Sequence, residues 1–477
     1  MQAAVALAAL SSTSISSASF AAMASAHGPM LDDWTGPHGG YPQFDKVTVP
    51  GIKDALLKGI NLERAEIRAI ANNKAAPTFE NTLAALEDSG RPFTRAVRFF
   101  GVWTSTLNGP EMQKVEEEMS PKLAAFGDEI IQNEALFKRV KAVYDTRASS
   151  GLDAQQQRLA DVQYTGFVRQ GAGLDKKGKD RLKQINQELA GLFTKFRQNQ
   201  LHDEETYTVV LESEADLAGL PDSLKAAAAE TAKKKGHAGK WAIANTRSSA
   251  EPFLTLSSRR DLREKVFKMW NSRGAADEAH ANKPIMTKIL RLRAERAKLL
   301  GYPTHAHWIL DDNMAKTPDN SLNLMMRVWK ASTARVHEDV AAMQKIADKE
   351  GAKIKIEAWD YRYYTEKLRK QQYDLDNNEV RQYLQLDKIR EGMFWAAGQV
   401  YGLQFAKLEG LPIAQADITV YEVSRGGKRV GLWYFDPYAR DGKNSGAWMN
   451  EYRTQERFKT EITPIVSNNA NFVKTKA

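Results

Sequence analysis

The sequence predicts a mainly α-helical protein with a small β-hairpin near its C-terminal end. Three observations lead to this prediction. Apolar residues recur at three- and four-residue intervals through most of the chain from residue 45 to residue 207. Several later stretches carry helix start and stop signals. One segment, residues 418–436, instead has the residue types of two short strands around glycines.

The long N-terminal region is predicted to be almost wholly helical until it reaches a short strand. Leu182, Ile185, Leu189, Leu192 and Phe196 form one apolar stripe, which we interpret as packing against neighbouring helices. Residues 206–211 (TYTVVL) have the β-branched content of a strand, and residues 240–244 are a second candidate. Between them, residues 223–235 predict an alanine-rich helix that ends in a basic turn.

The later part of the chain predicts four more helices and then the hairpin. Pro284 sits in a first helical turn and Gly301 stands just past the expected end of that helix. Further helices are predicted at residues 320–349, 356–371 and 389–401. In residues 418–436 two apolar runs flank Gly426 and Gly427, as in a hairpin with a glycine turn.

Composition bounds the class of protein. The 477 residues are 42% hydrophobic and 27% charged, which is usual for a soluble globular protein. The net charge of +9 comes with no nucleic-acid-binding motif, so we expect no nucleic acid partner. No apolar run is long enough for a membrane helix, and the absence of cysteine excludes disulfides and Cys-ligated metals.

The first residues have some features of an export signal. An apolar run at residues 3–10 is followed by a Ser/Ala-rich stretch and by Ala24-Ser25-Ala26, a small-x-small cleavage pattern. No basic residue precedes Lys46, so the basic start of a signal is absent. We expect a signal peptide at residues 1–26 and an exported, periplasmic protein; a cytoplasmic protein with a disordered leader is the alternative. Residues 27–43, rich in Gly and Pro, predict a linker.

A search for catalytic motifs gives a negative result. A zinc helix of the His-Glu-x-x-His type needs two histidines four residues apart. His337-Glu338 begins such a motif, but Ala341 stands where the second histidine belongs. His305 and His307 are the closest pair, but at two residues apart on a helix they point to different sides, and Thr304 predicts a cap there. No serine-hydrolase elbow or phosphate-binding loop occurs.

Several stretches, taken together and in order, resemble the M3 family of metallopeptidases. The stretches that carry the resemblance are residues 77–87 (PTFENTLAALE), 185–190 (INQELA), 289–302 (ILRLRAERAKLLGY), 314–318 (MAKTP) and 434–448 (YFDPYARDGKNSGAW). Residues 241–246 (WAIANT), 252–254 and 262–265 look more like the peptidyl-dipeptidase branch than like oligopeptidase A. The resemblance runs from about residue 44 to residue 472.

The resemblance implies two mostly helical lobes around a deep channel and zinc-dependent hydrolysis of short, unfolded peptides, with release of C-terminal dipeptides. In the family, the zinc ligands and the catalytic base lie beyond the position of Phe472. We therefore assign no catalytic and no metal-ligating residue to this sequence. We expect a chain cut before the zinc helix, inactive alone and fragile, because apolar faces would be uncovered.

We expect a helical N-terminal domain at residues 44–250 and the first part of the catalytic domain at residues 251–477. The hairpin adjoins the substrate channel in the family, which makes Tyr434, Asp436, Tyr438 and Arg440 candidate channel residues. The alternative is packing: Trp433 and Phe435 would share a face, and Asp436 would pair with Arg440. The family's usual His-Pro before the first strand is Ala414-Gln415-Ala416-Asp417 here.

Two other functions remain open from the residues alone. A non-catalytic helical scaffold would bind short peptides without zinc, and an unrelated metal enzyme would use His305 and His307. We expect a monomer with short, unstructured peptides as partners.

Overall fold

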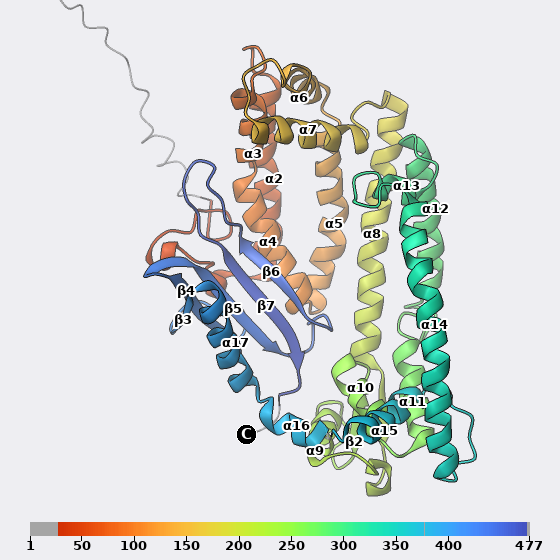
Figure 1. The fold of residues 1–477 in the computed structure, drawn as a ribbon. Helices are drawn as coiled ribbons and strands as arrows, with labels where there is room; N and C mark the ends of the chain where they lie inside the picture. Colours follow the sequence, from red (N-terminus) through yellow and green to blue (C-terminus); the bar gives the residue numbers. More distant parts are fainter. Residues whose placement is uncertain (1–26, 376, 475–477) are drawn as a thin grey trace, which may run out of the picture.

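The computed structural model describes residues 27–375 and 377–474, and these are mostly helical (Figure 1). The predicted signal peptide at residues 1–26 lies outside the described residues. The helices of the first half are α2 (Val49–Ala71), α3 (Ala85–Asp88), α4 (Arg91–Thr106), α5 (Pro110–Ile131), α6 (Glu134–Thr146), α7 (Ala154–Arg169) and α8 (Lys176–Thr206). A π-helical turn, η4 (Phe79–Ala84), precedes α3, and short 3-10 turns occur at η2 (Pro37–Gly39), η3 (Phe44–Lys46) and η5 (Glu214–Leu217).

The helices of the second half are α9 (Asp222–Lys234), α10 (Arg247–Leu256), α11 (Arg260–Asn271), α12 (Lys283–Leu299), α13 (His305–Leu310), α14 (Pro318–Lys349), α15 (Tyr361–Tyr373), α16 (Asn377–Tyr383) and α17 (Leu386–Tyr401). No helix in the described ranges combines the length and the apolar character that crossing a bilayer requires. The predicted helices at 223–235, 284–300, 320–349, 356–371 and 389–401 all occur, with ends shifted by up to five residues, and the apolar stripe at 182–196 lies within the longer helix α8.

Local sequence explains why the long helices start where they do. The Asp175 side chain accepts a hydrogen bond from the Gly178 backbone at 2.7 Å and so caps α8. Thr317 caps α14 in the same way, and Pro318 occupies its first turn. The apolar stripe on α8 is buried at Ile185 and Leu189, which pack against α12, so the packing interpretation is confirmed.

The predicted hairpin is confirmed and belongs to a larger sheet. Strands β4 (Thr419–Arg425) and β5 (Lys428–Tyr438) pair antiparallel around Gly426 and Gly427, whose φ angles of 54° and 74° suit a tight primed turn. The sheet order is β3-β4-β5-β7-β6, with β3 (Leu403–Leu408), β6 (Trp448–Arg453) and β7 (Ile465–Phe472); β5 and β7 are parallel. The sequence analysis did not predict β3, β6 or β7. The predicted strands near 206–211 and 240–244 are β1 (Thr208–Leu211) and β2 (Trp241–Ala244), which pair antiparallel.

The largest core joins the two ends of the chain. One face of the sheet packs on α2, α4 and α5, so that Phe44 and Phe99 share a cluster with Tyr434 and Tyr452. Residues 27–43, predicted to be a linker, contribute Met30 and Leu31 to this core, because apolar side chains within the Gly/Pro-rich stretch reach it. The boundary expected at residue 250 falls inside α10, a continuous helix.

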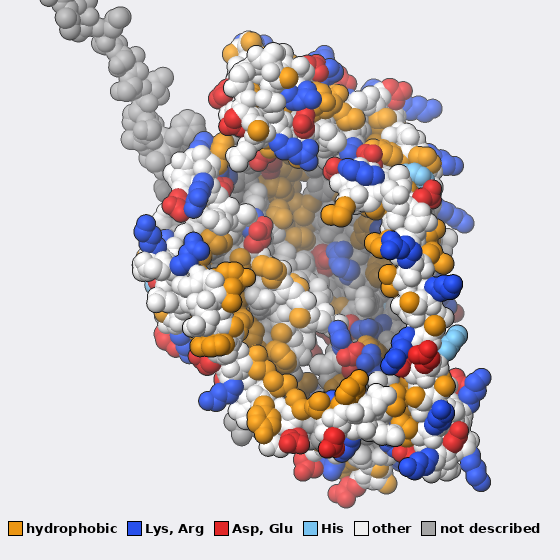
Figure 2. Space-filling view, in the orientation of Figure 1, with side chains coloured by type: hydrophobic (Ala, Val, Ile, Leu, Met, Phe, Trp, Pro, Cys, Tyr) orange, Lys and Arg blue, Asp and Glu red, His pale blue; other side chains and the backbone are white. Residues whose placement is uncertain are grey.

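Apolar side chains lie exposed on several helices, as the sequence analysis expected. On α14, Leu324 is 61% and Trp329 is 67% exposed, and on α17 Trp395 is 70% exposed. Figure 2 shows hydrophobic side chains gathered beside a deep hollow between the sheet and the long helices α8, α12 and α14. The long helices and the five-stranded sheet therefore surround a central hollow.

Candidate functional site

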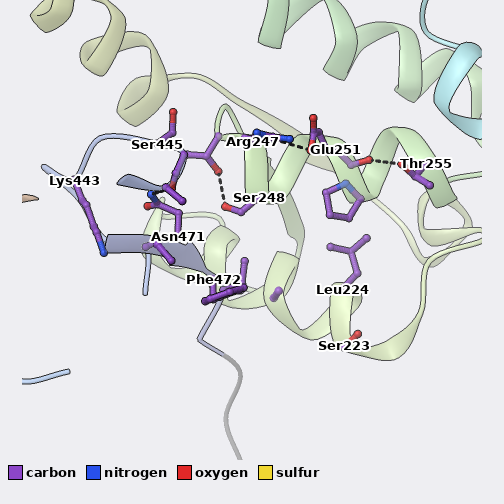
Figure 3. Close-up of a pocket in the computed structure, with 18 of the residues that line it drawn as sticks. Ser223, Leu224, Arg247, Ser248, Glu251, Thr255, Lys443, Ser445, Asn471 and Phe472 are labelled. Atoms are coloured by element: carbon purple, nitrogen blue, oxygen red, sulfur yellow. Dashed lines mark hydrogen bonds and ion pairs between the residues drawn. The ribbon is translucent and has the colours of Figure 1, made fainter. Parts of the chain in front are cut away.

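A cavity of about 740 Å³ lies where α9 and α10 approach the end of β7 (Figure 3). Its wall is completed by α15 and by the loop at residues 439–447. In Figure 1 these elements meet in the lower part of the molecule, below the hollow that Figure 2 shows in the same orientation. The side chains that matter most for its chemistry are Ser248, Arg247, Glu251, Arg362, Arg440, Lys443, Asn471 and Phe472.

The cations that line this cavity pair with two carboxylates, of which Glu251 lines the cavity and Asp436 is buried outside the lining. Glu251 on α10 accepts hydrogen bonds from Arg247 at 3.0 Å and from Arg362 at 2.8 Å. Asp436 at the end of β5 pairs with Arg440 and with Lys443, whose Nζ lies 2.9 Å from Oδ1. Around Glu251, two arginines share one carboxylate, which leaves an excess of positive charge at this part of the wall.

Lys443 is the most constrained of these cations. Its side chain is 0% exposed, and its Nζ donates to the backbone carbonyls of Asp436 and Tyr438 at 3.1 and 2.9 Å. Burial lowers the pKa of the Lys443 ammonium, and the hydrogen bond and charge of Asp436 oppose that shift. The lysine fixes the loop rather than presenting a free charge to the cavity.

The loop at residues 439–447 is held by helix ends from the first half of the chain. The Arg440 Nε donates to the Thr106 carbonyl of α4 at 3.0 Å. The Gly442 backbone donates to Glu205 of α8 at 2.7 Å, and the Asn444 backbone donates to the Ser105 carbonyl at 2.9 Å. Two helix ends distant in sequence, those of α4 and α8, therefore set the position of this cavity wall.

The structure separates the four predicted channel residues. Tyr434 is 0% exposed and packs on Phe44 and Tyr452, so it faces the core and offers no surface to a ligand. Asp436 is 2% exposed and acts through its ion pairs. Tyr438 is half-buried and Arg440 lines the cavity. A contact of Tyr438 or Arg440 with a substrate stays a prediction.

The packing alternative for the hairpin is what the structure contains. The rings of Trp433 and Phe435 stack with centroids 5.2 Å apart. Arg440 and Asp436 form a two-bond ion pair. Alternation along β5 places Tyr434 on the opposite face from these two rings.

Sequence reasoning missed Arg247, Glu251 and Arg362. An Arg–Glu pair four residues apart on a helix is a common surface feature and carries no functional signal alone. Arg362 lies more than a hundred positions away on α15, and only folding brings it to Glu251. No pattern in the sequence links the three.

The histidines do not form the arrangement that the third hypothesis required. Thr304 caps α13, and its Oγ1 lies 2.8 Å from His307 Nδ1. The His305 ring lies against Trp308, with ring centroids 5.5 Å apart. In the part of the chain that the structure describes, one group of three potential ligands is found, namely His202, Asp277 and His280.

Comparison with known proteins gives consistent matches. The sequence pattern of peptidase family M3 matches residues 253–477. The chain is 35% identical over 438 residues to the dipeptidyl carboxypeptidase of Escherichia coli (strain K12), covering 91% of this chain and 64% of that protein. The dipeptidyl carboxypeptidase of Salmonella typhimurium (strain LT2) is 35% identical over 448 residues, covering 94% of this chain and 66% of that protein.

Oligopeptidase A of Escherichia coli (strain K12) is more distant, at 26% identity over 421 residues, covering 87% of this chain and 62% of that protein. The chain thus spans a little under two thirds of the length of these relatives. The matches run across both the N-terminal helices and the sheet, in agreement with the resemblance found in the sequence. The chain belongs to peptidase family M3.

Proposed function

We propose that this chain builds the walls of a peptide channel in a peptidase that acts on short, unstructured peptides and releases dipeptides from their C-terminal ends. The observation that carries the proposal is the deep hollow of Figure 2, with the cationic cavity of Figure 3 below it. A hollow enclosed by helices admits an extended peptide and excludes a folded domain by size. Two of the relatives reported above are dipeptidyl carboxypeptidases, which supports the reaction type.

The excess positive charge of the cavity suggests which end of a peptide it takes. Arg247 and Arg362 share the single carboxylate of Glu251. A second carboxylate would complete the pairing, and the free C-terminus of a peptide supplies one that Arg binds in a two-bond geometry. We therefore propose that this cavity takes the C-terminal end of the substrate.

The residues present do not fit the catalytic zinc that the resemblance implies, because that ion is held by a His-Glu-x-x-His helix. The 477 residues contain no His-Glu-x-x-His motif, and His202, Asp277 and His280 come from two separate segments rather than from one helix. We propose that the family's zinc ligands and catalytic base are not supplied by this chain, and that the chain alone does not hydrolyse peptides. No step of the reaction is assigned to it beyond binding and orienting the substrate.

Peptide binding tests the proposal directly. Fluorescein-labelled hexapeptides with a free or an amidated C-terminus are titrated with the chain, and anisotropy is measured. We expect the free acid to bind at least severalfold more tightly, and Arg362→Gln to remove that preference. Arg335→Gln on α14, where Arg335 is 69% exposed, is the matched control and should change nothing. If neither peptide binds, the proposal fails.

A scaffold that only binds peptides is the second candidate, because the cavity walls are formed without a catalytic motif. The two candidate functions, peptidase channel and scaffold, are distinguished by adding a polypeptide that carries the remaining third of a relative. Dipeptide release from the mixture supports a peptidase channel; binding without any release supports a scaffold.

We also propose an exported monomer. N-terminal sequencing after cell fractionation tests the export: cleavage after Ala26 supports it, and an intact Met1 in the cytoplasm contradicts it.

A further inference from the structure

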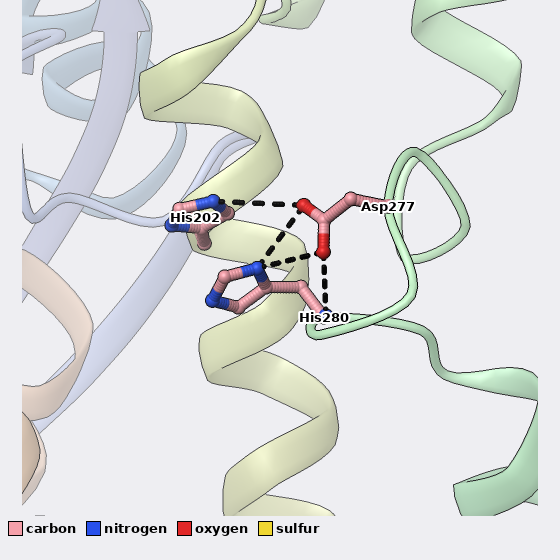
Figure 4. Close-up of side chains that lie close together, drawn as sticks. All are labelled: His202, Asp277 and His280. Atoms are coloured by element: carbon pink, nitrogen blue, oxygen red, sulfur yellow. Dashed lines mark hydrogen bonds and ion pairs between the residues drawn. The ribbon is translucent and has the colours of Figure 1, made fainter.

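Three potential metal ligands meet where the C-terminal end of α8 contacts the loop between α11 and α12. Figure 4 shows His202 projecting from α8 toward Asp277 and His280 of that loop. One ligand atom from each residue lies within 4.8 Å of the others. All three side chains are about one-third exposed, with values of 36%, 32% and 31%. The group is therefore open to ions and water from solution.

The distances are close to those of a tetrahedral site. Zinc–nitrogen and zinc–oxygen bonds of about 2.0–2.2 Å place neighbouring ligand atoms roughly 3.3–3.5 Å apart. His202 Nε2 lies 3.9 Å and His280 Nδ1 lies 3.1 Å from the same oxygen, Asp277 Oδ2. Both distances are within about half an ångström of the tetrahedral edge.

The ring orientation requires one adjustment. The two imidazole rings are stacked with centroids 3.6 Å apart and an angle of 15° between their planes. A metal ion lies in the plane of each ring that binds it, so one ring must turn about its Cβ–Cγ bond. The terminal torsion of histidine is broad, and His202 is exposed enough to turn.

Hydrogen bonds fix the loop on α8 at both sides of the group. The Gly274 backbone donates to the buried Asp203 carboxylate at 2.6 Å. Asn199 donates to Asn282 at 3.0 Å, and the Tyr207 hydroxyl donates to Asp277 Oδ2 at 3.0 Å. Because the backbone is already ordered, binding an ion here would cost little conformational entropy.

We propose that His202, Asp277 and His280 bind a divalent first-row transition metal ion, with zinc as the expected ion and water completing its coordination. Two imidazoles and one carboxylate favour zinc over magnesium or calcium, which prefer oxygen ligands alone. This site is separate from the zinc helix of the family and does not depend on the proposed peptidase function.

The proposed metal site lies next to the part of α8 that holds the cavity loop at residues 439–447. Two residues just beyond His202 on α8 hold the cavity loop: Glu204 accepts a hydrogen bond from the Ser445 hydroxyl at 2.9 Å, and Glu205 accepts one from the Gly442 backbone. A metal ion that joins the α11–α12 loop to this helix end would stabilise the junction from which the cavity wall is held. The ion acts here as a cross-link between segments distant in sequence.

The test uses the full chain, stripped with a chelator and then titrated with Zn²⁺ by calorimetry. We expect about one ion per chain with micromolar affinity and a raised melting temperature. Co²⁺ in place of Zn²⁺ should give visible absorption bands. The double variant His202→Asn/His280→Asn should lose at least tenfold in affinity, whereas His305→Asn/His307→Asn, the matched histidine pair on α13, should bind as the unaltered chain does.

A second measurement needs no variant and so does not depend on the variants folding. Diethylpyrocarbonate modifies exposed histidines, and mass spectrometry locates the modified residues. Zinc should protect His202 and His280 and leave His307 reactive. The proposal is overturned if no zinc binds in the micromolar range, if binding survives in the His202/His280 variant, or if protection falls on His305 and His307 instead.

Discussion

Arg440 donates two parallel hydrogen bonds to Asp436, with Nη1–Oδ1 at 2.8 Å and Nη2–Oδ2 at 2.7 Å. The pair connects the end of β5 to the cavity loop, and Lys443 adds a second cation to the same carboxylate. Because both partners are largely buried, the pair's geometry depends on all three groups being present.

Replacing Asp436 by Asn should destabilise the chain by roughly 3 kcal/mol, because it leaves two cations beside a neutral amide. Urea unfolding monitored by tryptophan fluorescence gives the free energy of unfolding. Asp441→Asn changes an exposed carboxylate in the same loop and should have almost no effect. Equal losses in the two variants would contradict the role assigned to Asp436.

Glu63 should make stability fall as pH rises. Burial, with a smaller contribution from Glu66, raises the pKa of Glu63 from 4.5 to about 7, and its Oε2 has no hydrogen-bond partner. The folded state therefore binds the proton more tightly than the unfolded state, and stability is lost between pH 4.5 and pH 7. Glu63→Gln should remove this loss. The free energy of unfolding of the variant, relative to that of the unaltered chain, should therefore rise between pH 4.5 and pH 7.

Urea midpoints at half-unit pH steps provide the measurement for Glu63. Partial exposure limits the expected gain at pH 8 to roughly 1 kcal/mol. The exposed Glu230→Gln is the control and should follow the unaltered chain at every pH. A Glu63→Gln curve parallel to that of the unaltered chain would rule out this source of pH dependence.

Gly431 should be intolerant of a side chain, because β7 passes it closely. A Cβ added there would lie 2.5 Å from the Pro464 carbonyl oxygen, which accepts the Leu432 backbone hydrogen bond at 3.1 Å. Gly431→Ala is expected to cost about 1–3 kcal/mol. Gly392→Ala on α17 meets nothing within 4 Å and should be neutral or slightly stabilising. A stable Gly431→Ala chain would argue against the parallel pairing of β5 with β7.

The exposed apolar face of α14 should make the isolated chain prone to non-specific aggregation at high concentration. Leu324→Gln with Trp329→Gln should reduce aggregation, measured by light scattering, without lowering the melting temperature. Met343→Gln on the same helix, where the side chain is 1% exposed, should instead lower the melting temperature. A soluble, monomeric unaltered chain at high concentration would show that the face is harmless.

Local signals predicted much of the fold because they act within a few residues. The cap at Thr304, the glycine turn at 426–427 and the apolar stripe on α8 all concern neighbours in sequence. Strands β6 and β7 were not predicted, because β7 pairs parallel with β5 across an intervening segment and no short pattern encodes such a pairing.

The sequence by itself determined the mainly helical class, the late hairpin and the resemblance to family M3, because these rest on local periodicity and on ordered motifs. Only the tertiary structure decided that Tyr434 faces the core while Arg440 lines a cavity. It also brought Arg362 to Glu251 and His202 to Asp277 and His280. The physical reason is the same in each case: which face of a strand is buried, and which distant charges meet, depends on packing between segments that lie far apart in the chain.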